Sequence, residues 1–378
     1  MPAVLLLLRR QSHPSAATSL PPGPPGWPIF GNMFELGPEP HKTIAGLKKA
    51  YGPVVSLRIG SIQTVALLDA RSATELFKKH DAGFSERAIT DVMRATGFER
   101  ASISLSPYGP YWRTMKRIMT VDLLTQGRIG KTGPVRRRCV DDMLRWIERE
   151  AGPGRPVHVA KLVFLALFNM IGNLVLSRDL AGPETDEASE FFEALLEAIE
   201  LSAQPNVVDA FPWLWWADPQ GLKRKAKRGF KKMLGIVGGL VAERLRERSS
   251  MGVEGKRDFL QVLLEHRRNG EGEMGQISDH NINVIVLELF MAGTETTSST
   301  LEWAMVELLK HPQAMTKVRD ELRAVVGNKG DKFEERHVDS LPYLQAVVKE
   351  TMRLHPVVPL LIPRRAVQET VFMGHRIP

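Results

Sequence analysis

Cysteine is nearly absent from this sequence, since Cys139 is the only one among 378 residues. A single cysteine excludes an intrachain disulfide and any zinc or iron–sulfur site built from several thiolates, and it favours a reducing compartment. Cys139 follows three arginines, at positions 136–138, whose charges would lower the pKa of its thiol. No catalytic partner accompanies it in the sequence, so we expect a structural thiol.

A long hydrophobic run is also missing at the N-terminus, where the apolar stretch 3–8 has only six residues. A membrane-spanning helix needs about 20 apolar residues and the core of a signal peptide about 7–15. We therefore interpret residues 1–20 as a shortened anchor or, equally, as a disordered leader. The proline-rich stretch 20–28 that follows is typical of a stiff, extended spacer.

A strong charge excess is lacking too, because 51 basic and 43 acidic residues leave a net charge of only +8. The basic residues are spread over many expected helices, and no nucleic-acid motif accompanies them. The charge thus fits a basic docking face or an anionic membrane surface better than nucleic acid. Hydrophobic residues make up 43% of the chain, which permits a sizeable core.

The most informative stretch is an expected helix over 278–312. Its first half, 282–292, is apolar almost all round, which is typical of a helix in the middle of a domain. Residues 293–300, here called the polar segment, then contain no large apolar side chain. Buried polar groups need partners, so this composition favours a functional site over a simple kink or a solvated face. Glu295 beside Thr296 places an acid next to a hydroxyl, as a proton relay requires.

Three further groups of residues suggest chemistry less strongly. Glu350 and Arg353 lie three apart on one helix face and can pair. Trp112 with Arg113, Lys116 and Arg117 could bind a carboxylate or phosphate, or could simply form a basic surface helix. The aromatic stretch 206–216 precedes a basic helix and suits either a membrane interface or a loop folded onto the core.

The remaining pattern predicts a mainly helical protein with a small sheet. A strand pair is expected from 54–59 with 63–68, and a strand and turn are expected over 371–378. Helices are expected over 41–50, 71–79, 135–149, 157–176, 187–203, 222–248, 258–266, 314–326 and from a cap at Ser340 to 354, with another beginning near Pro110. Charged or glycine-rich loops are expected over 249–256, 268–276 and 327–337.

Several motifs, in this order along the chain, resemble those of a plant microsomal cytochrome P-450. They are the proline hinge 21–24, the stretch 106–113 that ends in Tyr-Trp-Arg, the oxygen-activation pattern Ala-Gly-Thr-Glu-Thr-Thr at 292–297, the Glu-x-x-Arg helix at 349–356 and the stretch 359–364. The resemblance covers 21–378 and points to hydroxylases of terpenoids, phenylpropanoids or flavonoids. It implies a P-450 domain over 21–378, mainly α with a small β-sheet.

The resemblance also implies roles for individual residues. Thr296 and Glu295 would take part in proton delivery during oxygen activation. Ala292, Gly293, Trp112, Lys116, Arg117 and Arg364 would lie against haem, with lysine at 116 where the family's pattern has arginine. Glu350 and Arg353 would hold the core together. Phe98, Leu105, Val208 and Val358 would contact the substrate.

One expected feature of that family is missing from these 378 residues. The family binds haem iron through a cysteine in a loop of the form Phe-x-x-Gly-x-Arg-x-Cys after the Glu-x-x-Arg helix, and the thiolate favours O–O cleavage. No such loop occurs before Pro378, and Cys139 lies upstream in another context. We therefore expect a fold that is incomplete at its C-terminus, no metal ligand among these residues, and an inactive fragment.

The function expected from the resemblance is a haem-dependent monooxygenase that hydroxylates a small hydrophobic metabolite with O₂ and electrons from an NADPH-dependent reductase. The expected location is the cytosolic face of the endoplasmic reticulum membrane. The alternative is a non-catalytic remnant of the fold that lies on membrane surfaces or binds a hydrophobic ligand. No nucleic-acid partner is expected.

Overall fold

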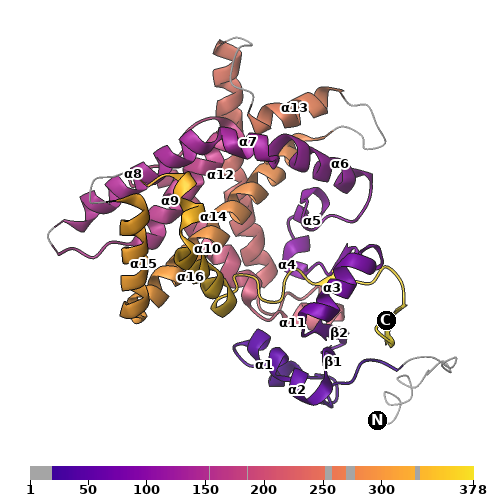
Figure 1. Cartoon of the computed structure of the whole chain (residues 1–378). Helices are drawn as coiled ribbons and strands as arrows, with labels where there is room; N and C mark the ends of the chain where they lie inside the picture. Colours follow the sequence, from indigo (N-terminus) through magenta and orange to yellow (C-terminus); the bar gives the residue numbers. More distant parts are fainter. Residues whose placement is uncertain (1–18, 153, 185, 252–257, 270–276, 328–332) are drawn as a thin grey trace. The chain divides into compact units, whose positions relative to one another are not determined.

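Helices make up most of this protein, and three two-stranded antiparallel sheets accompany them (Figure 1). The computed structural model describes residues 19–152, 154–184, 186–251, 258–269, 277–327 and 333–378. This architecture confirms the predicted mainly α fold with a small sheet content. The predicted leader over 1–20 and the glycine-rich loops over 249–256 and 268–276 lie largely outside the described residues.

The chain forms two compact units that are each built from separated segments. The first unit comprises Met1–Ala88, Asn206–Pro219 and Ile362–Pro378, and the second comprises Ile89–Pro205 and Gln220–Leu361. All of the strands belong to the first unit, whereas the long helices belong to the second.

The first unit contains the predicted hairpin, and a second hairpin where the sequence predicts a strand and a turn. Strands β1 (Val54–Ile59) and β2 (Ile62–Leu67) pair over their whole length, with Gly60 at φ +60° in the turn between them. Glycine suits that turn because a left-handed backbone carries no steric cost without a Cβ. Strands β5 (Thr370–Phe372) and β6 (His375–Ile377) form the second hairpin. A short pair that the sequence did not reveal joins β3 (Glu86–Arg87) to β4 (Arg364–Arg365).

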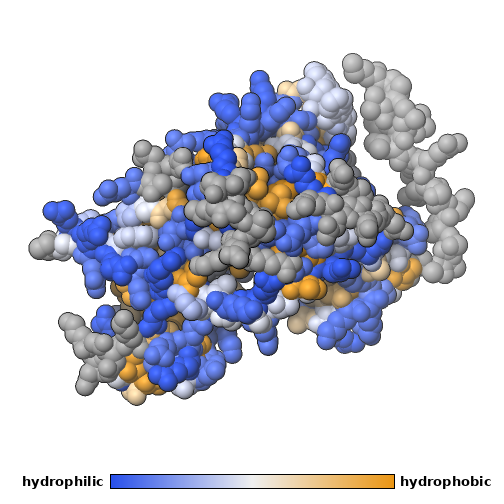
Figure 2. All heavy atoms as spheres, turned by 90° about the horizontal axis from the view of Figure 1, so that it is seen from above, coloured by the Kyte–Doolittle hydropathy of each residue, from blue (hydrophilic) through white to orange (hydrophobic). Residues whose placement is uncertain are grey.

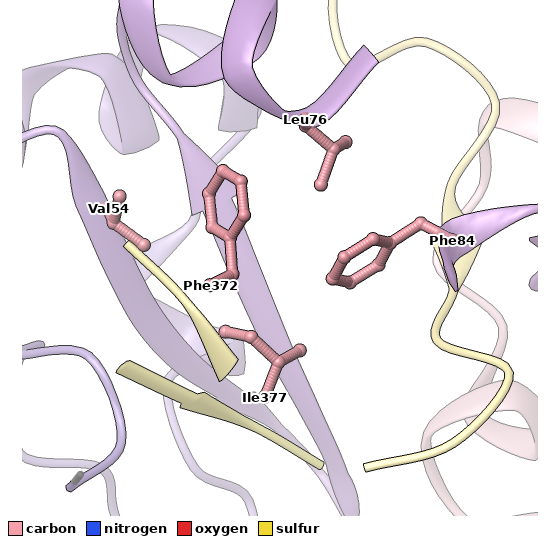
Figure 3. Close-up of a cluster of buried hydrophobic side chains, with 5 residues drawn as sticks. All are labelled: Val54, Leu76, Phe84, Phe372 and Ile377. Atoms are coloured by element: carbon pink, nitrogen blue, oxygen red, sulfur yellow. The ribbon is translucent and has the colours of Figure 1, made fainter. Parts of the chain in front are cut away.

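The core of this unit brings together side chains from residues 54–84 and from the C-terminal hairpin. Val54, Leu76, Phe84, Phe372 and Ile377 converge from β1, α3 (Ala70–Lys79), a short 3₁₀ helix and the last hairpin (Figure 3). The rings of Phe84 and Phe372 meet edge to face, with centroids 6.1 Å apart, an arrangement that aromatic pairs favour. Burial of these side chains thus fixes the C-terminal hairpin to the first strand and to α3.

The second unit is organised around two helices, α9 (Val159–Leu176) and α14 (Asp279–Lys310), which pack along each other (Figure 1). Phe168 of α9 lies 4.6 Å from Phe290 of α14 between ring centroids, and Phe191 lies 5.1 Å from Phe168. By length and composition α9 could cross a membrane, but 56% of it is buried inside the protein. Its apolar residues therefore serve the core.

Further helices surround this pair. The largest are α8 (Gly133–Ala151), α10 (Asp186–Ala203), α12 (Leu222–Met251), α13 (Phe259–Asn269), α15 (Pro312–Val326) and α16 (Pro342–Leu354). The shorter ones are α4 (Asp91–Arg94), α5 (Phe98–Ala101), α6 (Pro110–Ile118), the π-helix η3 (Met119–Leu123), α7 (Gln126–Lys131) and η5 (Glu335–Ser340). In the first unit lie η1 (Met33–Glu35), α1 (Pro40–Gly46), α2 (Lys48–Tyr51), η2 (Asp81–Phe84), α11 (Val207–Ala210) and η4 (Pro212–Leu214).

Two local predictions need correction. Ser340 does not cap α16, because it ends η5, and Leu341 occupies the N-cap position with Pro342 in the first turn. Proline at that position lacks the N–H that a cap would satisfy. The predicted loop over 206–216 contains the short helices α11 and η4, which begin after Asn206 and with Pro212.

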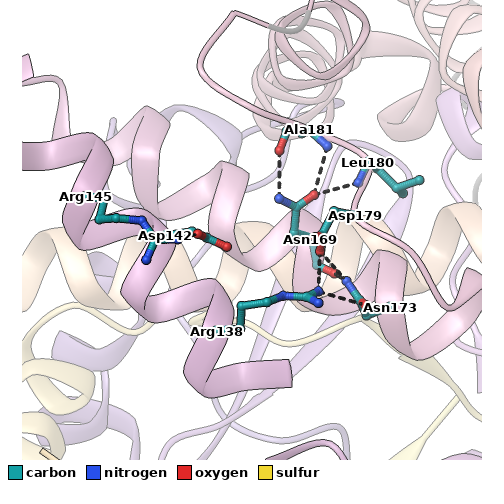
Figure 4. Close-up of polar contacts among 8 residues, drawn as sticks. All are labelled: Arg138, Asp142, Arg145, Asn169, Asn173, Asp179, Leu180 and Ala181. Carbon is teal, nitrogen blue, oxygen red and sulfur yellow. Dashed lines mark hydrogen bonds and ion pairs between the residues drawn. The ribbon is translucent and has the colours of Figure 1, made fainter. Parts of the chain in front are cut away.

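A buried amide holds the end of α9. Asn169 donates from Nδ2 to the Ala181 carbonyl at 2.7 Å, and its Oδ1 accepts from the backbone N–H groups of Leu180 and Ala181 at 2.8 and 2.9 Å (Figure 4). These three bonds pair backbone groups in the turn after α9.

The surface combines hydrophilic and hydrophobic areas. On the face drawn in Figure 2, hydrophobic residues lie among the predominant hydrophilic ones. Exposed hydrophobic side chains are numerous on the second half of α14 and on and after α16, and include Leu301, Met305, Leu309, Met352 and Leu360.

Candidate functional site

The candidate site lies on α14, whose ends are where the sequence predicts them. Ser278 caps the helix by accepting from the Asn281 backbone N–H at 3.1 Å, and the Asn281 side chain completes a reciprocal capping box. Such a box satisfies two backbone donors of the first turn. The helix ends at Lys310, before the proline that begins α15.

The polar segment satisfies its own hydroxyl groups. The side chains of Thr294, Thr296 and Thr300 each donate to the carbonyl four residues earlier, at 2.6, 2.7 and 2.8 Å, and Ser298 donates to the carbonyl of Glu295 at 3.1 Å. Serine and threonine commonly form such bonds within helices. These four hydroxyls therefore have partners within α14.

The two sides of the polar segment have different surroundings. Thr294 and Ser298 are buried, with 0% and 2% of their surfaces exposed. Ala292 is exposed, and Thr296 is half-buried. The hydrogen bond between the Thr296 hydroxyl and the Ala292 carbonyl thus lies on the side of α14 that the described residues leave more open. This side presents a hydroxyl of fixed orientation.

Glu295 is half-buried beside this pair. Burial raises the pKa of its carboxyl above the ordinary value of 4.5, and the negative charge of Glu302 raises it further. Among the described residues Glu295 forms no ion pair. A raised pKa without a cationic partner suits a carboxyl group that exchanges protons.

Gly293 allows α14 and α9 to approach each other. A Cβ at this position would lie 2.7 Å from Cδ1 and 3.1 Å from Cγ1 of Ile171 on α9. Helix–helix packing therefore accounts for this glycine, and any cofactor contact here would involve its backbone.

The aromatic and the basic side chains of α6 lie in different settings. The indole N–H of Trp112 donates to the carbonyl of Ile103 at 2.9 Å, so this donor has a partner within the protein. Lys116 and Arg117 are exposed on the same helix and form no ion pair with a described residue. These two cations therefore remain available for an anionic group.

The predicted substrate residues fall into three settings. Phe98 and Leu105 are buried in the second unit, and the ring of Phe98 lies 5.4 Å from that of Phe230. Val358 is exposed in the same unit, after α16. Val208 is buried in the first unit.

Arg364 also belongs to the first unit, where several contacts hold its guanidinium. Its Nη1 donates to Asp81 Oδ1 at 2.5 Å and to the Phe84 carbonyl at 3.2 Å. The guanidinium also lies 4.8 Å from the centre of the Phe77 ring, a cation–π distance. Arg364 faces Arg87 across the β3–β4 pair, and burial together with the Arg364 charge lowers the pKa of Arg87.

The pair predicted on α16 is formed. Arg353 donates to both carboxylate oxygens of Glu350, at 2.7 Å each, in the bidentate geometry that arginine favours. More than half of each side chain is exposed, and an exposed pair contributes little to stability by itself.

Cys139 is buried on α8. Burial raises the pKa of its thiol, and this effect outweighs the lowering effect of Arg138, which instead pairs with Asp179 at 2.7 Å. A protonated, buried thiol fits a structural role and does not fit a metal-binding thiolate. Among the residues that the structure describes, no three His, Cys, Asp or Glu side chains form a group suited to a metal ion.

The sequence pattern did not reveal the role of one carboxylate near the site, that of Glu288. Glu288 lies one helical turn before Ala292 and is hydrogen-bonded to the loop around Ile103. The only sequence signal was a lone acid in an otherwise apolar stretch.

Comparisons with known proteins agree on one family. The cytochrome P450 family model matches residues 21–378. The chain is 48% identical to cytochrome P450 76A2 of Solanum melongena over 382 positions, covering 100% of this chain and 75% of that protein. It is 42% identical to an iridoid oxidase of Catharanthus roseus (99% and 74% covered) and 37% identical to a geraniol 8-hydroxylase of the same plant (95% and 72% covered).

Proposed function

Since this chain belongs to the cytochrome P450 family of monooxygenases, we propose that it acts on a small hydrophobic secondary metabolite. The relatives named above include a geraniol 8-hydroxylase and an iridoid oxidase, and the chain is also 39% identical to a 7-ethoxycoumarin O-deethylase of Helianthus tuberosus. The proposed reaction is a hydroxylation that uses O₂ and electrons from an NADPH-dependent reductase. The proposed catalytic domain is 21–378, preceded by a leader over 1–20.

The observation that carries this proposal is the hydrogen bond of 2.7 Å from the Thr296 hydroxyl to the Ala292 carbonyl. The carbonyl accepts the hydrogen bond from the hydroxyl and so fixes where the lone pairs of the hydroxyl oxygen point. This oxygen can then accept a hydrogen bond from a water on the open side of α14. Glu295, one residue away, has a raised pKa and can return protons to this position.

Haem is the cofactor that the family implies, and when bound it supplies the oxygen-activating chemistry. The side chains on and near the open side of α14 suit a bound haem. Ala292 presents a small side chain on the open side of the helix, and Lys116 and Arg117 are exposed cations suited to propionates. In our proposal Trp112 supports this region through its bond to Ile103, Gly293 contributes backbone, and Glu350 with Arg353 keeps the structural role that the family implies. The haem contact of Arg364, which lies in the first unit, stays a prediction.

Cys139 does not fit the thiolate that ligates haem iron, because burial keeps its thiol protonated. We propose that the 378 residues by themselves do not form a thiolate-ligated haem protein. The test is the absorbance spectrum of the reduced, CO-treated chain after reconstitution with haem. No thiolate-type band is expected, and such a band would overturn the proposal. Cys139→Ser then identifies the ligand, since loss of the band in that variant would assign the role to Cys139.

A membrane-surface role is the second proposal, and an exposed aromatic surface in the first unit favours it. Trp27, Phe30, Phe34, Trp213, Trp215 and Trp216 form this surface. Phe30 lies 5.1 Å from Phe34 and 5.9 Å from the buried Phe211, which in turn lies 5.1 Å from Trp213, measured between ring centroids. Exposed tryptophans of this kind are typical of the membrane–water interface.

This surface is compatible with an enzyme at the endoplasmic reticulum membrane and with a non-catalytic remnant that lies on membranes or binds a hydrophobic ligand. Binding to lipid vesicles, with Trp216→Ser compared against Trp303→Ser of the other unit, tests the membrane contact. We expect binding to weaken only for Trp216→Ser. Oxygenation of an apolar substrate by a haem-loaded form of the chain extended through a Phe-x-x-Gly-x-Arg-x-Cys loop separates the enzyme from the remnant.

A further inference from the structure

Glu288 binds a loop that is distant in sequence. Its Oε2 accepts from the backbone N–H of Ile103 at 2.8 Å, and its Oε1 accepts from the backbone N–H of Ser104 at 2.9 Å. The hydroxyls of Ser102 (2.7 Å) and Ser104 also donate to Oε1. One carboxylate thus receives four hydrogen bonds, and all four come from three consecutive residues.

The same loop is linked to α6 by two other side chains. The Tyr111 hydroxyl donates to the Ala101 carbonyl at 2.6 Å, and the Trp112 indole donates to the Ile103 carbonyl at 2.9 Å. Ser102 is fully buried, and Leu105 and Ser106 are nearly so. The loop is therefore held between α6 on one side and Glu288 on the other.

The placement of Glu288 on α14 brings this loop close to the proposed site. Glu288 and Ala292 are four residues apart, and Ala292 and Thr296 are again four apart, so the three lie along roughly one side of the helix. Eight residues of helix span about 12 Å. Leu105, expected to contact substrate, follows directly after the residues that Glu288 holds.

We propose that Glu288 is a positioning residue, which fixes the 102–105 loop on α14 and thereby sets how the substrate lies against Thr296. This inference rests on the proposed function. A carboxylate is suited to the task because both of its oxygens accept hydrogen bonds, whereas the N–H groups of Ile103 and Ser104 only donate. Glutamine would direct an NH₂ group at one of these donors and leave a buried N–H unpaired.

The first measurement needs no cofactor and no activity. Hydrogen exchange of residues 102–105 is followed by mass spectrometry in the 378-residue chain, in Glu288→Gln and in Ser104→Ala. We expect exchange to become faster by at least about tenfold in Glu288→Gln, because bonds to a charged acceptor are strong. Ser104→Ala loses one of the four donors and keeps both backbone bonds, so a smaller increase is expected.

The matched control is Glu307→Gln. Glu307 lies on the same helix, and its Oε1 accepts from His355 Nε2 at 3.0 Å, away from the loop. Exchange of 102–105 should not change in this variant. Unchanged exchange in both Glu288→Gln and Ser104→Ala would overturn the proposal, and Ser104→Ala keeps the test valid if Glu288→Gln fails to fold.

The second measurement is made on a haem-loaded, reductase-supported form of the chain that is extended through a Phe-x-x-Gly-x-Arg-x-Cys loop. Glu288→Gln should raise KM and change the ratio of hydroxylation products, with a smaller effect on kcat, whereas Glu307→Gln should leave the ratio as it is. Faster exchange with an unchanged KM and product ratio would overturn the positioning role. If this extended parent oxygenates no substrate, the proposed function fails, and the exchange data still decide whether Glu288 holds the loop.

Discussion

The Thr296 hydroxyl donates to the carbonyl of Ala292, one turn earlier on α14, at 2.7 Å. Thr300 makes the same bond to the carbonyl of Thr296 at 2.8 Å, one turn further along the helix. The two threonines therefore have the same local geometry, and only the first lies in the proposed oxygen-activation pattern. Substitution of Thr300 can therefore serve as the control for substitution of Thr296.

In a haem-loaded form of the chain extended through a Phe-x-x-Gly-x-Arg-x-Cys loop, Thr296→Ala should raise the amount of peroxide released per substrate oxidised several-fold, because a positioned hydroxyl no longer guides proton delivery. Thr300→Ala should leave the ratio near that of the parent. Peroxide and product are measured together with NADPH consumption. An unchanged ratio in Thr296→Ala would remove this residue from the relay.

Glu295 should make stability depend on pH. Its pKa is raised in the folded protein, so the folded state holds more protons than the unfolded state above about pH 4.5, and stability falls as the pH rises through this window. Glu295→Gln should therefore be more stable than the parent near neutral pH, with the difference disappearing in acid. Melting temperatures across this range test the sign, and a less stable variant at neutral pH would contradict it.

Gly293→Val should destabilise the second unit by about 1–3 kcal/mol, because the added side chain meets Ile171 on α9. Truncation of the neighbour in a Gly293→Val/Ile171→Ala double variant should recover part of this loss. Gly235→Val is the control, since a Cβ at that exposed position of α12 meets no atom within 4 Å. Urea unfolding measures all three, and equal losses at both glycines would refute the packing explanation.

Asn169→Ala should cost about 3 kcal/mol, because it leaves the N–H groups of Leu180 and Ala181 and the carbonyl of Ala181 without their partner. Asn173→Ala is the comparison. Its amide bonds Asp179 and Arg138 in a more exposed setting, where water can replace the lost contacts. Denaturant unfolding of the two variants should show the larger loss at Asn169.

Much of the fold followed from local patterns. The capping residue Ser278 and the proline at 312 set the bounds of α14, because these signals act within one helical turn. The β1–β2 hairpin followed from two apolar runs around Gly60. The β3–β4 pair did not, because its two residues per strand depend on a partner nearly 280 positions away.

The features of the candidate site also fall into those that local sequence patterns predict and those that depend on distant residues. The order of motifs along the chain identified the family, and the spacing of Ala292 and Thr296 on a helix placed their side chains one turn apart. Four other features depend on neighbours from distant parts of the chain: the packing of Gly293 against Ile171, the commitment of the Trp112 donor to Ile103, the burial of Cys139 and the bonds of Glu288 to the 102–104 loop. The sequence by itself thus determined the family and the helix that carries the site, because helix periodicity and capping are local. Only the tertiary structure decided which polar groups are already paired and which remain open, because burial and hydrogen bonding depend on contacts between residues up to 283 positions apart.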